Sequence, residues 1–155
     1  MKRFITEHHK RRSVSLDGLW RFITDKKDEG ISLGYPAGLP AAAVSTYVPS
    51  VFASTPTLLG YEGVCWYERE VYIEKGSIRL HFGAVMTDAT VYLDGKEIGK
   101  HYGGFCEFEF LLSIEAAGNH RLTVRVDNRF DAHSIPQEVV VNIYSTQVFA
   151  VKWMI

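Results

Sequence analysis

The sequence predicts an all-β domain built as a β-sandwich, and three observations lead to this class. Short apolar stretches recur in which large side chains alternate with polar ones, the period of a strand with one buried face. Turn residues separate these stretches at intervals of about 10 to 15 residues. No stretch keeps a helical period over three turns. Five or more strands of this kind favour two packed sheets.

The alternation locates the strands. Ile78, Leu80 and Phe82 share one face, with polar residues between them. A tight hairpin is expected at Asp94 and Gly95, because both residue types tolerate a positive φ. The expected strands comprise residues 16–22 with their leading turn, 66–73, 78–82, 90–93, 106–110 and 122–126.

Composition narrows the classes of function. A length of 155 residues suits one domain, and a formal net charge of −1 gives no basic surface for nucleic acid or anionic lipid. No apolar run reaches about 18 residues, so no membrane span is expected. The basic N-terminus lacks the apolar segment of a secretory signal, which predicts a cytoplasmic location. Cys65 and Cys106 have neither disulfide nor metal spacing, and we expect buried free thiols.

No pattern of catalytic residues is present, and no cofactor or metal site is expected. The chain lacks a nucleophile elbow, a phosphate-binding loop, a dinucleotide fingerprint and a zinc-protease motif. His8 and His9 are neighbours on a polar arm and do not converge on a metal. Glu107 and Glu109 have the residue type that glycoside hydrolysis uses, but on a strand they would lie roughly 7 Å apart in water. We interpret them as solvated carboxylates.

Aromatic side chains are the candidates for ligand contact. A sugar ring has flat C–H faces, which Trp and Tyr rings can cover while nearby polar groups bind the hydroxyls. The candidate substrate-binding residues are Trp66, Tyr67, Tyr102 and Phe105. Most such rings in a β-sandwich belong to the core or to cross-strand pairs. The sequence leaves open whether Trp66 and Tyr67 point into the sandwich or out of it.

Seven short segments form a specific series, although each is common alone. They are LDGLWRF at residues 16–22, VPS at 48–50, GYEGVCWYEREV at 60–71, LHFGAV at 80–85, ATVYLDG at 89–95, HYGGF at 101–105 and VRVDN at 124–128. In this order they resemble the start of a family 2 glycoside hydrolase. The block at residues 66–71 and the segment SIP at residues 134–136 suggest the β-glucuronidase branch over the β-galactosidases.

The resemblance implies a jelly-roll sugar-binding domain. In such enzymes an immunoglobulin-like domain and a TIM barrel follow, and the barrel carries the acid/base and nucleophile glutamates, the first inside an Asn-Glu pair. This chain has no Asn-Glu dipeptide, and 155 residues cannot hold a barrel of about 250. We therefore expect a non-catalytic sugar-binding or scaffold domain of an O-glycosyl hydrolase that acts in carbohydrate metabolism.

The resemblance divides the chain into three parts: a flexible arm at residues 1–12, the sugar-binding domain at 13–136 and an atypical tail at 137–155. Residues 51–54 read VFAS, where the family often has an aromatic residue and then Asn-Asp. After residue 136 the family continues toward an Asp that reaches the barrel's active site, whereas residues 137–155 contain neither Asp nor Gly. A truncated gene or a shifted reading frame would produce this tail, and a divergent short domain is the alternative.

Two other functions stay open. A stand-alone lectin-like sandwich would need a pocket with stacked aromatic rings and convergent polar groups. A structural domain could form a homodimer through the apolar residues 139–155, by adding strands to a neighbouring copy. In the leading interpretation the partner is a carbohydrate, bound weakly or only when the missing barrel supplies the other wall of the site.

Overall fold

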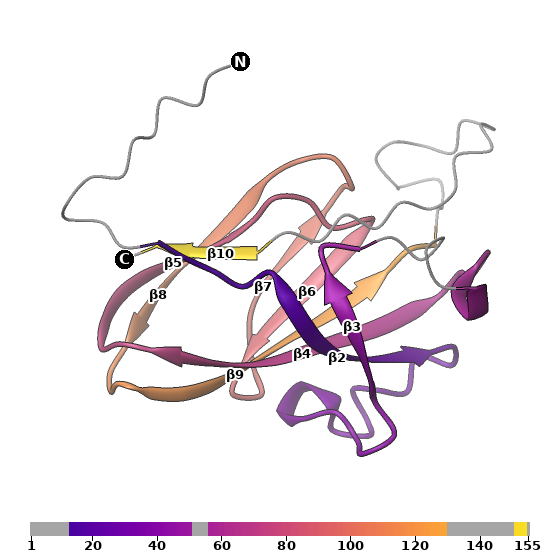
Figure 1. Cartoon of the computed structure of the whole chain (residues 1–155), viewed down its shortest axis with the longest axis horizontal. Coiled ribbons are helices and arrows are strands. Elements are labelled where there is room, and N and C mark those ends of the chain that lie inside the picture. The colour runs from indigo at the N-terminus through magenta and orange to yellow at the C-terminus, as the bar shows by residue number, and fades with distance from the viewer. Residues whose placement is uncertain (1–12, 51–55, 130–150, 155) are drawn as a thin grey trace.

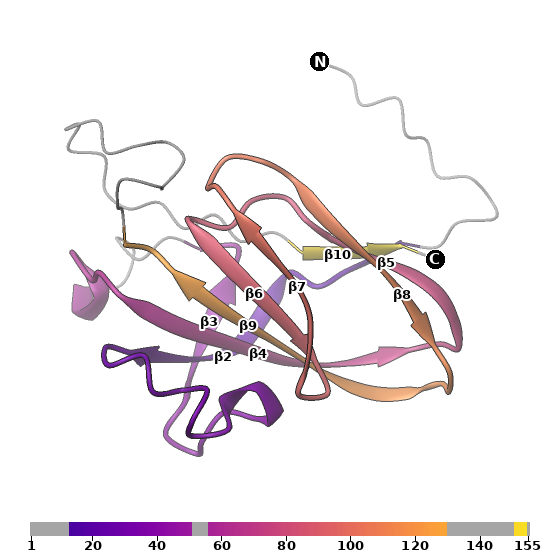
Figure 2. The same cartoon turned by 180° about the vertical axis from the view of Figure 1, so that it is seen from behind.

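The computed structural model describes residues 13–50 and 56–129 and the backbone of residues 151–154. Its two antiparallel sheets confirm the expected all-β sandwich (Figures 1 and 2). The sheets have the orders β1-β10-β5-β8 and β3-β2-β4-β9-β6-β7. The strands of the described residues are β1 (Ser13–Ser15), β2 (Gly18–Asp25), β3 (Val44–Val48), β4 (Val64–Ile73), β5 (Gly76–Phe82), β6 (Asp88–Leu93), β7 (Lys96–Tyr102), β8 (Phe108–Ile114), β9 (Gly118–Asp127) and β10 (Val151–Met154). Two short 3₁₀ helices are η1 (Tyr35–Ala37) and η3 (Pro56–Leu58).

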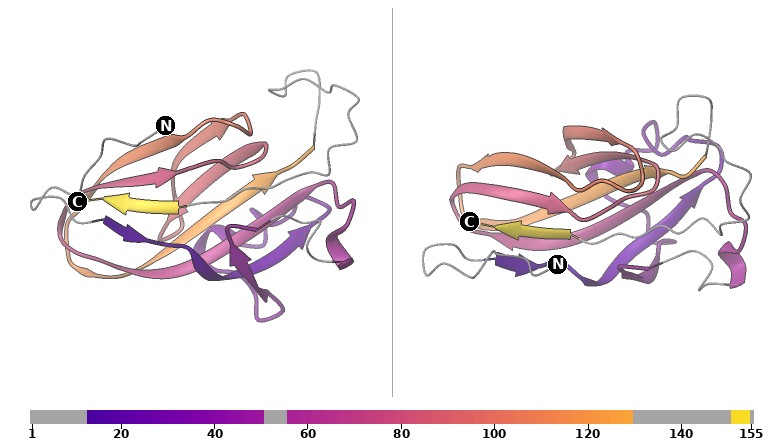
Figure 3. Two further views of the ribbon diagram at one scale, coloured as in Figure 1. Left: turned by 45° about the horizontal axis from the view of Figure 1, so that its top comes forward. Right: turned by 90° about the horizontal axis from the view of Figure 1, so that it is seen from above.

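The main core lies between the two sheets. Strands β5, β8 and β10 lie on one side of β4 and β9 (Figures 1 and 3). The side chains that fill the space come from alternating positions of the strands, including Ile78, Leu80, Phe82, Cys65, Tyr67, Val71, Leu122, Val124 and Val126. Those of β5 and β9 follow the expected alternation, whereas the inward face of β4 was left open by the sequence. Each large side chain removed from water contributes about 1.5–3 kcal/mol. This continuous core is therefore the main source of stability.

The longest ladder joins β4 to β9 in the middle of the six-stranded sheet. It runs from Val64 opposite Asp127 to Ile73 opposite Gly118. Alternate residues of β4 pack into the main core, and the residues between them point to the other face of the sheet. On that face Trp66 is 0% exposed. The first half of β4 is therefore covered on both sides, whereas Glu70 and Tyr72 on the outer face of its second half are exposed.

The cover on the outer face comes from the connection between β2 and β3, residues 26–43. This connection runs along the side of the six-stranded sheet that faces away from β5 and β8 (Figures 1 and 2). A second apolar cluster forms beneath it, made of Leu39, Val64, Trp66 and Tyr92. The connection between β2 and β3 is thus an ordered layer with a small core of its own.

One buried carboxylate ties this layer to the sheet. Asp25, at the end of β2, accepts a hydrogen bond from the Trp66 indole Nε1 at 2.9 Å. It also accepts bonds from the backbone N–H groups of Glu29 at 2.9 Å and Gly30 at 2.8 Å. The carboxylate thereby satisfies three donors and orients the start of residues 26–43.

The hairpin and one of the two cysteine predictions hold. Asp94 and Gly95 have φ values of 50° and 80°, and they connect β6 to β7 as expected.

Cys65 is buried, as predicted, but the prediction for Cys106 was wrong, because its thiol is exposed. The alternation placed this strand two residues too early: β8 begins at Phe108, and Cys106 lies in the turn before it.

The end of the chain returns to the four-stranded sheet. Strand β10 pairs with β1 on one side and β5 on the other, with Trp153 opposite both Val14 and Leu80. Both edges of this strand are therefore occupied within the chain, so residues 151–154 offer no edge to a second copy. Residues 139–150 and 155, the rest of the segment predicted to form a homodimer, lie outside the described residues. The arm predicted at residues 1–12 lies outside them as well.

Replacing the buried carboxylate tests the attachment of the outer layer. Asp25→Ala removes the acceptor from three donors, two of them in buried hydrogen bonds, so we expect the free energy of unfolding to fall by at least about 2 kcal/mol. Urea denaturation followed by tryptophan fluorescence measures this. Glu115→Ala, at an exposed acidic position, is the control and should change stability by less than about 0.5 kcal/mol. Equal midpoints for the two variants would contradict the assigned role of Asp25.

A pair of glycine substitutions tests the contact between the two sheet edges at β7 and β8. A Cβ atom at Gly99 would overlap the ring of Phe110, whereas a Cβ at Gly118 would have no heavy atom within 4 Å. We expect Gly99→Ala to destabilise the protein by about 1–3 kcal/mol through overpacking. Gly118→Ala should be close to neutral. Thermal denaturation compares them, and similar melting temperatures would show that β7 and β8 are packed less closely than described.

Candidate functional site

The unequal size of the two sheets leaves part of the inner face uncovered. Six strands face four, and β3 is the edge strand of the larger sheet. Phe22 and Val44 are directly opposite one another in the β2–β3 ladder, so both side chains point to the same face. Phe22 is 4% exposed and Val44 is 59% exposed. The core therefore ends between Phe22 and Val44, and the inner face of β3 is open at its Val44 end, whereas Val48 at the other end is 1% exposed and belongs to the main core.

A cavity of about 420 Å³ occupies this overhang. Its floor is the β2–β3 ribbon, and residues 57–61 with η3 form the opposite wall. The lining residues are Phe22, Ile23, Thr24, Lys26, Ala42, Val44, Ser45, Thr46, Thr57, Leu58 and Tyr61. We call this space the β2–β3 pocket. It combines an apolar floor with hydroxyl groups and one ammonium group, a composition typical of small-molecule sites.

Two side chains set the electrostatics of the β2–β3 pocket. The Lys26 ammonium lies 6.0 Å from the centre of the Tyr61 ring, a cation–π distance. The Tyr61 hydroxyl donates a 2.5 Å hydrogen bond to the carbonyl of Val64. Burial, with further contributions from nearby Cys65 and acidic groups, raises the pKa of Tyr61 to about 12. The phenol therefore stays neutral at physiological pH.

Long-range hydrogen bonds hold the wall that carries Tyr61. Asn128 is buried just after β9 and donates from Nδ2 to the carbonyl of Tyr61 at 2.7 Å. Its Oδ1 accepts from the backbone N–H of Gly63 at 2.7 Å. The backbone N–H of Asn128 also donates to the Gly63 carbonyl, at 3.3 Å. One asparagine thus binds the segment that precedes β4 to the end of β9.

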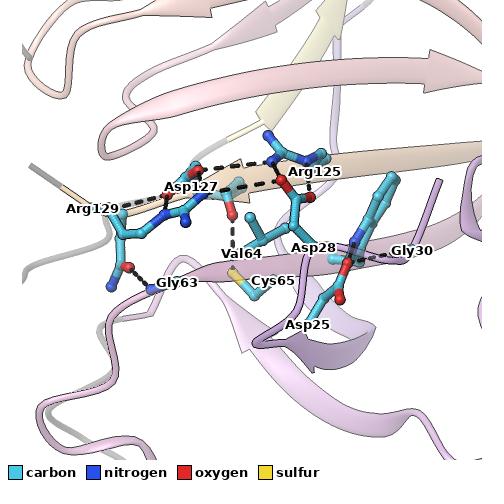
Figure 4. Close-up of polar contacts among 12 residues, drawn as sticks. Asp25, Asp28, Gly30, Gly63, Val64, Cys65, Arg125, Asp127 and Arg129 are labelled. Atoms are coloured by element: carbon cyan, nitrogen blue, oxygen red, sulfur yellow. Dashed lines mark hydrogen bonds and ion pairs between the residues drawn. The ribbon is translucent and has the colours of Figure 1, made fainter. Parts of the chain in front are cut away.

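Four side chains of alternating charge hold the second wall of the β2–β3 pocket, the segment that carries Lys26. Asp28 points from the β2–β3 connection toward Arg125 of β9, with contacts of 2.7 and 3.1 Å (Figure 4). Asp127 lies 3.7 Å from Arg125 and pairs with Arg129. Burial alone would raise the pKa of the Asp127 carboxyl, but hydrogen bonds from Arg129 and the charges of both arginines hold it below its usual value. These ion pairs fix the segment that begins at Lys26 against β9.

The four predicted contact residues are not at this pocket. Trp66 and Tyr67 are buried inside the fold, and Tyr67 packs on Phe22 with ring centres 5.0 Å apart. Tyr102 and Phe105 are 66% and 69% exposed, at the end of β7 and in the turn before β8. The structure therefore separates the two buried rings from the two exposed ones. None of the four lines the β2–β3 pocket.

No sequence motif marks the residues of the β2–β3 pocket. Lys26 and Thr46 lie in or beside a stretch without clear periodicity, and Tyr61 is part of a block that we used only for the family resemblance. Ladder pairing at β3 and the long-range bonds of Asn128 bring them together. No motif spacing encodes this convergence, because the three positions are joined only through the fold.

The two buried carboxylates serve structure. Glu68 accepts from Arg21 at 2.6 Å and from the backbone N–H of Leu39 at 2.5 Å. Asp25 is held by the three donors described above. On the surface, the expected pair of solvated glutamates contacts side chains of β5: Glu109 lies 3.4 Å from Arg79, and Glu107 lies 3.2 Å from the His81 ring nitrogen Nε2. Each of these acidic groups therefore has a local structural partner.

Several residues of the seven sequence blocks fasten turns. The Trp20 indole donates to the carbonyl of Leu16 at 2.8 Å, and Arg69 donates to the same carbonyl at 2.6 Å. Asp94 accepts from the backbone N–H of Arg121 at 2.8 Å and contacts His120 Nδ1 at 2.6 Å. The blocks that carry the resemblance thus preserve the fold.

Within residues 13–50 and 56–129, no three His, Cys, Asp or Glu side chains gather as metal ligands would. None of the described residues forms a helix long and apolar enough to cross a membrane.

Comparison with known proteins assigns the family. Residues 13–147 match the family described as "Glycosyl hydrolases family 2, sugar binding domain", and this match runs past residue 136, where we expected the family pattern to end. A β-glucuronidase of Streptococcus agalactiae is 34% identical over 135 residues, which cover 81% of this chain and 21% of that protein. The chain thus spans about a fifth of this relative's length.

Solved structures agree. The β-glucuronidase of Lactobacillus rhamnosus superposes with a TM-score of 0.85 at 25% identity, over 97% of this chain and 30% of that one. The β-glucuronidase of Ruminococcus gnavus in complex with D-glucuronic acid gives a TM-score of 0.81 at 28% identity, with the same two coverages. The chain belongs to the sugar binding domain family of the family 2 glycosyl hydrolases.

Proposed function

We propose that this chain is the non-catalytic, carbohydrate-binding part of a family 2 glycoside hydrolase of the β-glucuronidase type, active in carbohydrate metabolism. The observation that carries the proposal is the family match over residues 13–147, in a chain that spans only a fifth of its Streptococcus relative. The catalytic residues of such an enzyme would lie in the part of the protein that this chain does not include. O-glycoside hydrolysis is then the activity of the whole enzyme.

The contacts that the carboxylate side chains make support a non-catalytic role. Retaining glycosidases need two carboxyl groups about 5–5.5 Å apart, one of them kept protonated as the acid. Among the described residues, the buried Asp25 and Glu68 are each occupied by donors from the β2–β3 connection. Glu107 and Glu109 are exposed beside His81 and Arg79. None of these four carboxylates lines the β2–β3 pocket.

The β2–β3 pocket supports carbohydrate binding. It presents an apolar floor and several hydroxyl groups in one hollow of about 420 Å³. A sugar ring has the same two kinds of surface, C–H faces and hydroxyl groups. The relatives named as β-glucuronidases, one of them solved with D-glucuronic acid, support a glucuronide as the substrate class of the whole enzyme.

Calorimetry and a hydrolysis assay test the two halves of the proposal. We expect the full chain to give saturable heat with methyl β-D-glucuronide or methyl β-D-galactoside. We expect no release of 4-nitrophenol from 4-nitrophenyl β-D-glucuronide, because the described carboxylates lack catalytic geometry. The heat-unfolded chain is the control for nonspecific heat. Turnover by the purified chain would contradict the non-catalytic role, and the absence of heat with every sugar would contradict carbohydrate binding.

A further inference from the structure

We propose that the β2–β3 pocket binds a monosaccharide that carries a carboxylate, a uronic acid residue, with the Lys26 ammonium as its counter-ion. This inference rests on the proposed carbohydrate-binding function and names the ligand class and the place. The four aromatic residues predicted from the sequence have no part in it.

The size and shape of the pocket suit one sugar ring. At about 420 Å³ it lies in the lower part of the range of roughly 300–1,000 Å³ of small-molecule pockets. The hollow exists because β3 overhangs the smaller sheet, so its floor is rigid ladder structure and not a loop. A floor of this kind is preorganised and needs little ordering when a ligand binds.

The polar groups are placed for a hydroxylated ligand. In the β2–β3 ladder Thr46 is opposite Trp20 and Val44 is opposite Phe22, so both side chains share the inner face with the apolar floor. Thr24, two residues beyond Phe22 on β2, has the same orientation. Thr57 lines the opposite wall. A ring between these walls would meet hydroxyl groups on both sides and apolar atoms of Phe22 and Val44 beneath.

The charge of the pocket favours an anion. Lys26 and Tyr61 are its two titratable lining residues, and Tyr61 is a neutral phenol near pH 7. Among the described residues no carboxylate lies within ion-pair distance of Lys26: Asp25 is held by Trp66 and two backbone N–H groups, and Asp28 is bound to Arg125. A ligand carboxylate would supply the missing negative charge, which a neutral hexose cannot do.

Lys26 has an exposed side chain, and the chain on both sides of Lys26 is held in place. Its ammonium lies over the Tyr61 ring, and the adjoining chain is tied on one side by Asp25 and on the other by the Asp28–Arg125 pair. A surface ion pair is weakened by the entropy that a long side chain loses when it is held in one geometry. For Lys26 part of this ordering is complete before a ligand binds. Specificity for a uronate then follows from a held charge beside a ring-sized hollow.

The test compares methyl β-D-glucuronide with methyl β-D-glucoside, which lacks the carboxylate, by calorimetry on the full chain at low salt. We expect the glucuronide to bind about two- to fivefold more tightly, the contribution of one exposed ion pair. Lys26→Met should abolish this preference. Lys27→Met, a neighbouring lysine outside the pocket, should retain it. At about 0.15 M salt the preference should shrink through screening.

A second variant tests the place independently of charge. Thr46→Val removes one hydroxyl of the floor, and we expect both glycosides to bind less tightly while the preference between them stays. Equal affinity of the unaltered chain for both glycosides, or a preference that survives in Lys26→Met, would overturn the inference but leave carbohydrate binding in place. No heat with any sugar would instead refute the proposed function itself.

Discussion

Burial of the first half of β4 on both faces is the constraint on which the rest of this domain depends. A strand in an ordinary sandwich turns one face to water, but here residues 26–43 cover the outer face as the second sheet covers the inner one. Polar atoms on the covered face must then find partners inside the protein. The Trp66 indole finds Asp25, and Glu68 finds Arg21 and the backbone of Leu39. The outer layer is therefore held by hydrogen bonds as well as by apolar contact.

The same contacts place the pocket. Both of its walls are attached to the end of β9, one through Asn128 and the other through the Asp28–Arg125 pair. The floor belongs to the β2–β3 ribbon, which extends beyond the smaller sheet. A hollow that would be filled in a sandwich with sheets of equal size is thus left open and lined by fixed side chains.

The seven sequence blocks that identify the family have structural roles in this domain. The blocks identify the family because they maintain turns, sheet contacts and the outer layer, as Trp20, Arg69 and Asp94 illustrate. The pocket residues Lys26 and Thr46 lie outside these blocks. The family resemblance therefore reflects the architecture of the domain, and the proposed pocket combines Phe22 and Tyr61 of the blocks with residues that lie between the blocks.

The sequence by itself determined the all-β class, the sandwich, the hairpin at Asp94 and the family. Each of these rests on local signals: alternation within a strand, turn residues between strands, and short blocks in a fixed order. Local alternation misplaces a strand boundary where an apolar residue precedes the strand, as Cys106 does before β8.

Only the tertiary structure decided which aromatic rings are buried and where a ligand could lie. Trp66 alternates like a surface residue of its strand, but residues 26–43 cover it. Lys26, Thr46 and Tyr61 become neighbours through strand pairing and the bonds of Asn128, across separations that no periodicity spans. The pocket itself exists because six strands pack on four, and that inequality is a property of the whole fold and not of any segment.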